Sequence, residues 1–89
     1  MKFDWDDSKA DINRRKYGVD FDEATTVFGD PFAGTFMDPD HSVGELRLIT
    51  VGKSSVGRLL VVSHTENSVE VRIISARLAT AHERKKYET

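Results

Sequence analysis

The side chains of this chain that are best suited to chemistry are arginines, a histidine and glutamates in its C-terminal half. Side chains alternate between the two faces of a β-strand, so the turns decide which of them lie side by side. We centre the first turn between residues 54 and 55 and the second on residue 67. One sheet face then carries two rows, Arg47, Val62 and Arg72 in one and Glu45, His64 and Glu70 in the other.

Two arginines beside a histidine and carboxylates would suit a phosphate ligand. The planar guanidinium fork matches phosphate oxygens, and His64 could exchange protons near neutral pH. The alternative is a cross-strand ladder in which the arginines and glutamates of the two rows only neutralise one another. The residues alone leave both interpretations open.

Three strands are predicted to position these side chains, over residues 45–51, 58–65 and 69–76. The segments are rich in β-branched residues and are separated by turn-forming glycine, serine and asparagine. The face opposite the arginines is predicted to form the core, with Leu46, Leu48, Leu59, Val61, Val71 and Ile73.

The N-terminal half supplies the helices that would cover that core. A strand over residues 2–5 precedes a helix over 8–17, which begins at a capping box and ends at Gly18. A second helix follows Asp20 and runs to about residue 28, and a strand is predicted over 32–37. A capping box of Thr80 and Glu83 opens a last helix over 80–87.

The order of elements, β-α-α-β-β-β-β-α, predicts one α+β domain over residues 1–89, with helices on one face of a small antiparallel sheet. The chain holds no cysteine, which excludes disulfides and thiolate metal sites. No signal peptide or membrane-spanning segment is visible, so cytoplasmic residence is expected. Residues 1–45 carry 11 acidic and 5 basic side chains, whereas residues 46–89 carry 4 acidic and 8 basic ones. This distribution indicates an acidic and a basic surface.

Other polar clusters give weaker indications. Asp38, Asp40 and His41 lie in one loop, but they are too few and too irregularly spaced to predict a metal site. Lys53 lies in a turn between two glycines, yet the spacing is not that of a phosphate-binding P-loop. We therefore expect neither a metal nor another cofactor.

Three stretches of the sequence resemble the BrnT toxin family. The first is Phe3-Asp4-Trp5-Asp6 with Lys9 and Asn13, continued by Lys16-Tyr17-Gly18-Val19-Asp20-Phe21, Glu23-Ala24 and Val27-Phe28. The second is Glu45-Leu46-Arg47 with Gly52 and Arg58-Leu59-Leu60-Val61-Val62. The third, and most specific, is Arg72-Ile73-Ile74-Ser75-Ala76-Arg77 with Glu83-Arg84 and Tyr87. Tyr17 stands where the family commonly has histidine.

The resemblance implies a RelE-like fold and a metal-independent endoribonuclease that acts as the toxin of a type II toxin–antitoxin system. It also implies neutralisation by a cognate ribbon-helix-helix antitoxin, within a heterotetramer, with DNA contacted only through that antitoxin. The alternative is a non-catalytic module that binds the antitoxin and acts as a co-repressor on the operator.

With RNA as the expected substrate, the candidate site becomes more specific. Arg47, Arg72 and Arg77 are the expected phosphate or transition-state clamps, and His64 is the expected general base, with Glu45 or Glu70 as substitutes. Further RNA contacts are expected from Lys53, Arg58, Ser75 and Tyr87.

Overall fold

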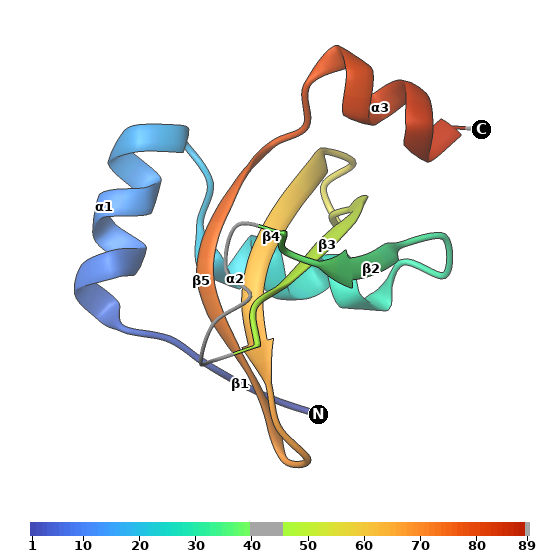
Figure 1. Cartoon of the computed structure of the whole chain (residues 1–89). Coiled ribbons are helices and arrows are strands. Elements are labelled where there is room, and N and C mark those ends of the chain that lie inside the picture. The colour runs from blue at the N-terminus through green and yellow to red at the C-terminus, as the bar shows by residue number, and fades with distance from the viewer. Residues whose placement is uncertain (40–45, 89) are drawn as a thin grey trace.

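The computed structural model describes residues 1–39 and 46–88 and contains a five-stranded sheet with three α-helices (Figure 1). The strands are β1 (Lys2–Asp4), β2 (Gly34–Met37), β3 (Leu48–Lys53), β4 (Leu59–Glu66) and β5 (Glu70–Leu78). The helices are α1 (Asp7–Tyr17), α2 (Phe21–Thr26), which continues as the short 3-10 helix η1 (Val27–Gly29), and α3 (Ala81–Glu88). The predicted class and the predicted order of elements are confirmed.

The strand order across the sheet is β1-β5-β4-β3-β2. Four strands pair antiparallel, as predicted, but β1 runs parallel to β5, so the sheet is mixed. The chain that connects β1 to the other strands includes α1 and α2, and this long connection allows β1 to lie parallel to β5. Residues far apart in sequence, such as Asp4 and Arg72, thereby become neighbours.

The helix ends follow the local sequence signals. Asp6 caps α1, with its carboxylate accepting from the backbone N–H of Ser8 at 2.8 Å. Gly18 ends the helix in the left-handed conformation, with a φ of 69°. The cap residue, Asp6, lies two residues before Ser8, the first residue of the predicted capping box.

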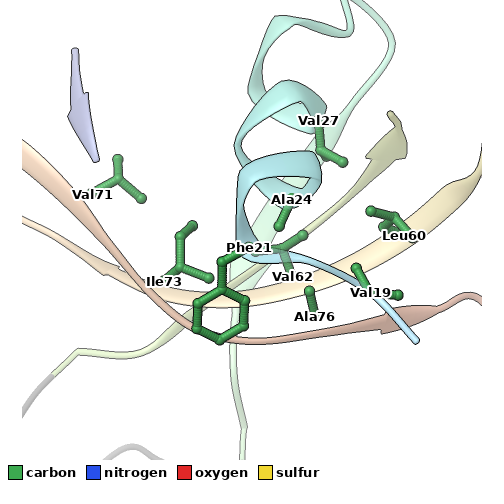
Figure 2. Packing of buried hydrophobic residues seen from close by; sticks show 9 residues of the cluster. All are labelled: Val19, Phe21, Ala24, Val27, Leu60, Val62, Val71, Ile73 and Ala76. Atoms are coloured by element: carbon green, nitrogen blue, oxygen red, sulfur yellow. The ribbon is translucent and has the colours of Figure 1, made fainter. Parts of the chain in front are cut away.

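The main core lies between α2 and the sheet (Figure 2). Phe21, Ala24 and Val27 project toward the sheet, where β4 and β5 supply the other side of the core. The buried sheet residues of this cluster are Leu60, Val62, Val71, Ile73 and Ala76. Helix α1 packs along β5, and α3 lies at the far end of the sheet, near β2 and the loop that precedes it (Figure 1).

The predicted register of the first hairpin is wrong. Leu48 pairs with His64 and Thr50 with Val62, whereas the prediction placed Arg47 opposite Val62. The turn is centred on residue 56, because the left-handed position that closes it is taken by Gly57, with a φ of 86°. Consequently Leu60 and Val62 face α2, and Leu59 and Val61, predicted to do so, are buried on the opposite side of the sheet.

The predicted register of the second hairpin is also wrong. The turn places Thr65 opposite Arg72, and a bulge between Ser63 and His64 then shifts the pairing by one more residue, so that Val62 lies opposite Ala76. The row of Arg47, Val62 and Arg72 therefore does not form. Val71 and Ile73 do belong to the core, as predicted, while Leu46 is exposed. Glu45 lies outside the described residues, as do Asp40 and His41.

Candidate functional site

Strand β5 presents three polar side chains on the sheet face opposite the core. Val71, Ile73 and Ala76 are buried in the core, and Arg72, Ser75 and Arg77 lie between and beyond them on the other face. The spacing is uneven because of the bulge, which keeps side chains on both sides of it facing outward. Two of the three predicted arginines thus share one strand face.

Arg77 is held by a two-point contact with α3. Its Nη1 and Nη2 donate to the two carboxylate oxygens of Glu83 at 2.8 and 2.9 Å. Glu83 also accepts from the backbone N–H of Thr80 at 2.9 Å, which completes the predicted capping box of α3. The hydrogen bonds from Arg77, followed by those from Thr80, lower the pKa of Glu83 to about 2. Glu83 is therefore an anion at every working pH, and it fixes the guanidinium of Arg77 in one orientation.

Arg72 contacts a carboxylate on the neighbouring strand. Its Nη1 donates to Asp4, the residue opposite it on β1, and about half of the Arg72 side chain is exposed. This is a cross-strand ion pair of the kind that the ladder interpretation predicted, although with a different partner. Arg72 and Arg77 are both paired, yet both remain accessible to an anionic ligand.

A shallow hollow lies beside these residues, between α1 and the outer edge of β5. It is lined by Lys9, Ile12, Asn13, Lys16, Tyr17, Ile74 and Ser75. Lys9 and Lys16 are seven residues apart, which places them on the same side of a helix. Lys16 Nζ lies 5.2 Å from the centre of the Tyr17 ring. The pKa of Arg77 is raised, mainly by its hydrogen bonds to Glu83, and Tyr17 makes the smallest contribution to this shift.

The two lysines were missed as site residues in the sequence. The i, i+7 spacing of Lys9 and Lys16, which places both on one side of a helix, was the available signal. What the sequence could not show is that this side of α1 lies next to Ser75 of β5.

Asn13 fixes α1 against β5. Its amide nitrogen donates to the carbonyls of Val19 at 3.0 Å and Ala76 at 2.8 Å, and its amide oxygen accepts from the Ala76 N–H at 3.0 Å. The Asn13 side chain is buried. It satisfies the backbone N–H and C=O of Ala76, which lies past the residues of β5 that pair with β1. The position of the hollow therefore depends on this one residue.

His64 does not join the arginines. It is fully buried on the core face, its Nε2 lies 2.7 Å from Thr50 Oγ1, and its ring packs edge-to-face against Phe28. Burial lowers the pKa of His64 to about 4, so the ring is neutral at physiological pH. The expectation that it lies beside the arginines as an accessible base is wrong, because the shifted hairpin turns it inward.

Arg58 is engaged with the N-terminal half of the chain. Its Nε donates to Glu23 at 3.0 Å and its Nη2 to the Gly18 carbonyl at 3.1 Å. Glu23 also accepts from Ser54 Oγ at 2.7 Å, and hydrogen bonding to Arg58 is the main cause that lowers its pKa. This arrangement ties the β3–β4 turn to α2 and gives Arg58 a structural role.

The other predicted RNA contacts lie elsewhere. Lys53 and Tyr87 meet at Asp30, which accepts from the Lys53 backbone N–H at 2.8 Å and from the Tyr87 hydroxyl. Arg47 is half-buried just before β3, where its carbonyl accepts from the Asp38 N–H at 2.9 Å. None of these three residues lines the hollow beside α1.

The described ranges 1–39 and 46–88 hold neither a metal-binding cluster nor a membrane-spanning helix. There, no group of three or more histidine, cysteine, aspartate or glutamate side chains is placed to hold a metal ion. No helix in these ranges is long and apolar enough to cross a membrane.

The fold is that of a known ribonuclease toxin. The 1.1 Å crystal structure of the Brucella abortus ribonuclease toxin BrnT superposes with a TM-score of 0.66 at 24% sequence identity, covering 90% of this chain and 97% of the other. The family model of the ribonuclease toxin BrnT of type II toxin–antitoxin systems matches residues 5–83. A comparison with curated protein sequences gives no match.

The chain belongs to the BrnT family of ribonuclease toxins. The resemblance found in the sequence is thereby confirmed, and with it a ribonuclease of a type II toxin–antitoxin system, a class that implies an RNA substrate and an antitoxin partner.

Proposed function

We propose that the chain is an endoribonuclease that binds RNA in the hollow between α1 and β5 and cleaves it without a metal ion. The observation that carries the proposal is the meeting of two lysines of α1 with Ser75 in one hollow, with the anchored Arg77 two residues further along β5. Lysine binds phosphate as a point charge and arginine as a planar fork, so the three cations suit an RNA backbone.

RNA supplies its own nucleophile, because the 2′-hydroxyl lies next to the scissile phosphate. The protein then needs to hold that hydroxyl in line with the leaving oxygen and to stabilise the negative charge that develops on the phosphate. In this proposal Arg77 supplies the stabilising charge, while Lys9 and Lys16 position the flanking phosphates. Tyr17 and Ser75 offer hydroxyl groups at the same hollow.

Anchoring by Glu83 supports this role for Arg77. A side chain that is already fixed loses less conformational freedom when the transition state forms, so its charge is preorganised. The carboxylate of Glu83 offsets the positive charge of Arg77. The exposed Lys9 and Lys16 of the hollow keep the surface cationic. Arg72 extends that surface toward β1, where it would contact RNA beyond the cleaved bond.

The first test compares RNA cleavage by the Arg77→Ala variant with that of the unmodified chain. Loss of a charge that stabilises the transition state should lower the cleavage rate by on the order of a hundredfold. Arg77→Lys should recover part of the rate, since it keeps the charge but not the fork. Arg15→Ala is the matched control, because Arg15 lies on α1 outside the hollow and pairs with Asp11 of the same helix. Undiminished cleavage by Arg77→Ala would remove Arg77 from the site.

The second test concerns the chemistry. Attack by the 2′-hydroxyl leaves a 2′,3′-cyclic phosphate, so the ends of the RNA fragments should carry that group, and cleavage should persist in EDTA. Mass spectrometry of the fragments formed with and without EDTA identifies the end groups and shows whether cleavage persists. Loss of activity in EDTA with recovery on addition of Mg²⁺ would contradict the metal-independent mechanism.

The antitoxin is proposed to be a ribbon-helix-helix protein that forms a heterotetramer with two toxin chains. In that arrangement the toxin would contact DNA only through its partner. Size-exclusion chromatography with light scattering on the co-expressed pair measures the stoichiometry, and a 1:1 dimer would contradict the heterotetramer.

A further inference from the structure

β2 is the outermost strand of the sheet at the end away from α1. All four of its residues, Gly34 to Met37, are exposed, and within the described residues no strand pairs with its outer edge. The outer edge of a strand carries backbone N–H and C=O groups directed into solvent, which can pair with another extended chain. Proteins usually protect such an edge with charges or proline, whereas β2 reads Gly-Thr-Phe-Met and carries neither.

The surface beside this edge is apolar. Phe32 is 80% exposed, Phe36 52% and Met37 62%, although large apolar side chains are normally buried. A hollow of about 270 Å³ lies between β2 and α3 and is lined by Phe32, Gly34, Phe36, Val51, Glu83, Lys86 and Tyr87. This volume lies below the roughly 300 Å³ at which small-ligand pockets begin, so it suits side chains of a peptide better than a whole ligand.

The walls of the hollow are fixed before anything binds. Asp30 accepts from the Tyr87 hydroxyl of α3 and from the backbone N–H of Lys53 of β3, and its other oxygen accepts from the Phe32 N–H at 2.9 Å. These contacts hold α3 and the loop before β2 in place. A preformed apolar hollow loses little entropy on binding.

The charges around the hollow favour an acidic partner. Lys86 lines it, Lys53 lies at the adjoining end of β3, and α3 carries Arg84 and Lys85. Helix α3 also carries Glu83 and ends with Glu88, and the carboxylates of Asp30 and Glu83 already accept hydrogen bonds from other residues of the chain. Complementary charge on the partner would raise the association rate and select its orientation.

We propose that the edge of β2 and the adjoining hollow form the docking surface for an extended segment of the cognate antitoxin, which adds a strand to β2. The segment would place apolar side chains at alternate positions in the hollow and carboxylates beside the lysines. The inference rests on the antitoxin partnership and adds to it the surface and the chemistry of the segment.

RNA fits this surface less well than a peptide does. The unpaired backbone edge offers hydrogen bonds in the spacing of a β-strand, which an RNA backbone does not match, and the two large side chains of β2, Phe36 and Met37, are apolar. The docked segment would also lie next to Glu83, whose other contact is with Arg77. Docking here would place the partner at the border of the proposed RNA site.

The experiment measures the affinity of the purified, full-length cognate antitoxin for variants of the full chain by isothermal titration calorimetry. Phe36→Glu brings an acidic group to the apolar edge, and Lys86→Glu reverses a charge in the hollow. Each should weaken antitoxin binding by about tenfold or more, as expected for truncated or mismatched contacts at the centre of an interface. Val69→Glu is the control, since Val69 is also an exposed apolar residue, at 66%, but lies in the β4–β5 turn.

RNA cleavage by the same variants separates this inference from the proposed function. We expect cleavage to stay within about twofold of the unmodified chain, and circular dichroism to show the same folded content. Unchanged antitoxin affinity in both variants would overturn the docking surface, even if the chain cleaves RNA as proposed. A loss of cleavage equal to the loss of affinity would assign the surface to RNA. A change in the oligomeric state of the isolated variants would assign it to a second copy of this chain.

Discussion

At the scale of single residues, His64 is a neutral core histidine. Its Nε2 lies 2.7 Å from Thr50 Oγ1, while its Nδ1 has no hydrogen-bond partner among residues 1–39 and 46–88 and lies 3.4 Å from Glu66 Oε1. Protonation would place a charge in a fully buried position, with Glu66 as the carboxylate that a protonated ring would face. The residue therefore affects how stability depends on pH and does not contribute an accessible base.

The direction of this pH dependence follows from the lowered pKa. Above the ordinary value of 6.5 the ring is neutral in both states, so its contribution to stability is fully present. Between pH 6.5 and about 4 the unfolded chain takes up a proton that the folded chain does not, and the free energy of unfolding falls as the pH falls. The total loss from this residue is roughly 3 kcal/mol at most.

We predict that His64→Gln flattens this dependence. Glutamine cannot titrate, so the free energy of unfolding, measured by urea denaturation between pH 7 and 4, should lose the slope that His64 contributes. His82→Gln is the control, because His82 lies exposed on α3 and should leave the slope as it is. An unchanged slope in His64→Gln would show that His64 titrates alike in both states.

At the scale of elements, two close contacts position the sheet against its helices. Asn13 connects α1 to β5 through three buried hydrogen bonds, which sets the hollow beside Ser75. The second contact is between β3 and η1, where Gly52 lies against Val27. A Cβ at this position would approach Val27 Cγ1 and Ala33 Cβ to 2.8 Å.

We predict that Gly52→Ala destabilises the fold, because the added methyl group would overlap the side chains of Val27 and Ala33. Overpacking of this kind costs typically 1–3 kcal/mol, so the midpoint of urea unfolding should fall accordingly. Gly34→Ala is the matched control on the neighbouring strand, where a Cβ would meet nothing within 4 Å. Equal stability of the two variants would mean that β3 and η1 move apart at little cost.

At the scale of the whole molecule, the charge is segregated along the chain. Residues 1–45 have 11 acidic and 5 basic side chains, and residues 46–89 have 4 and 8. The segregation is only partly carried into space, because α1 brings Lys9 and Lys16 from the acidic half to the edge of β5. The proposed RNA surface therefore combines cations from both halves.

We predict that RNA binding weakens with salt in proportion to the phosphates contacted. Three contacts, by Lys9, Lys16 and Arg77, give a slope of about −2 in a plot of log affinity against log salt for a single strand. Lys9→Ala should reduce the slope by about 0.7, whereas Arg15→Ala, outside the hollow, should not. Fluorescence anisotropy with a 2′-O-methyl RNA, which cannot be cleaved, measures binding alone. An equal slope for both variants would exclude Lys9 from the RNA surface.

The sequence by itself determined the elements, their order and the family. Helix caps such as Gly18 and the Thr80–Glu83 pair are local signals, because the groups that satisfy one another are only a few residues apart. The runs of β-branched residues likewise located β4 and β5, and Arg72 was correctly placed on the C-terminal strand. Arg77 was predicted to follow that strand, whereas it lies within β5.

Only the tertiary structure decided which side chains lie together. A turn centred on residue 56 and a bulge between Ser63 and His64 change the strand register, and a shift of one residue exchanges the two faces of a strand. This is why His64 is buried and why the predicted arginine row is replaced by Arg72, Ser75 and Arg77 along β5. The hollow of Lys9 and Lys16 also arises in three dimensions, because Asn13 joins residues 63 positions apart in the chain.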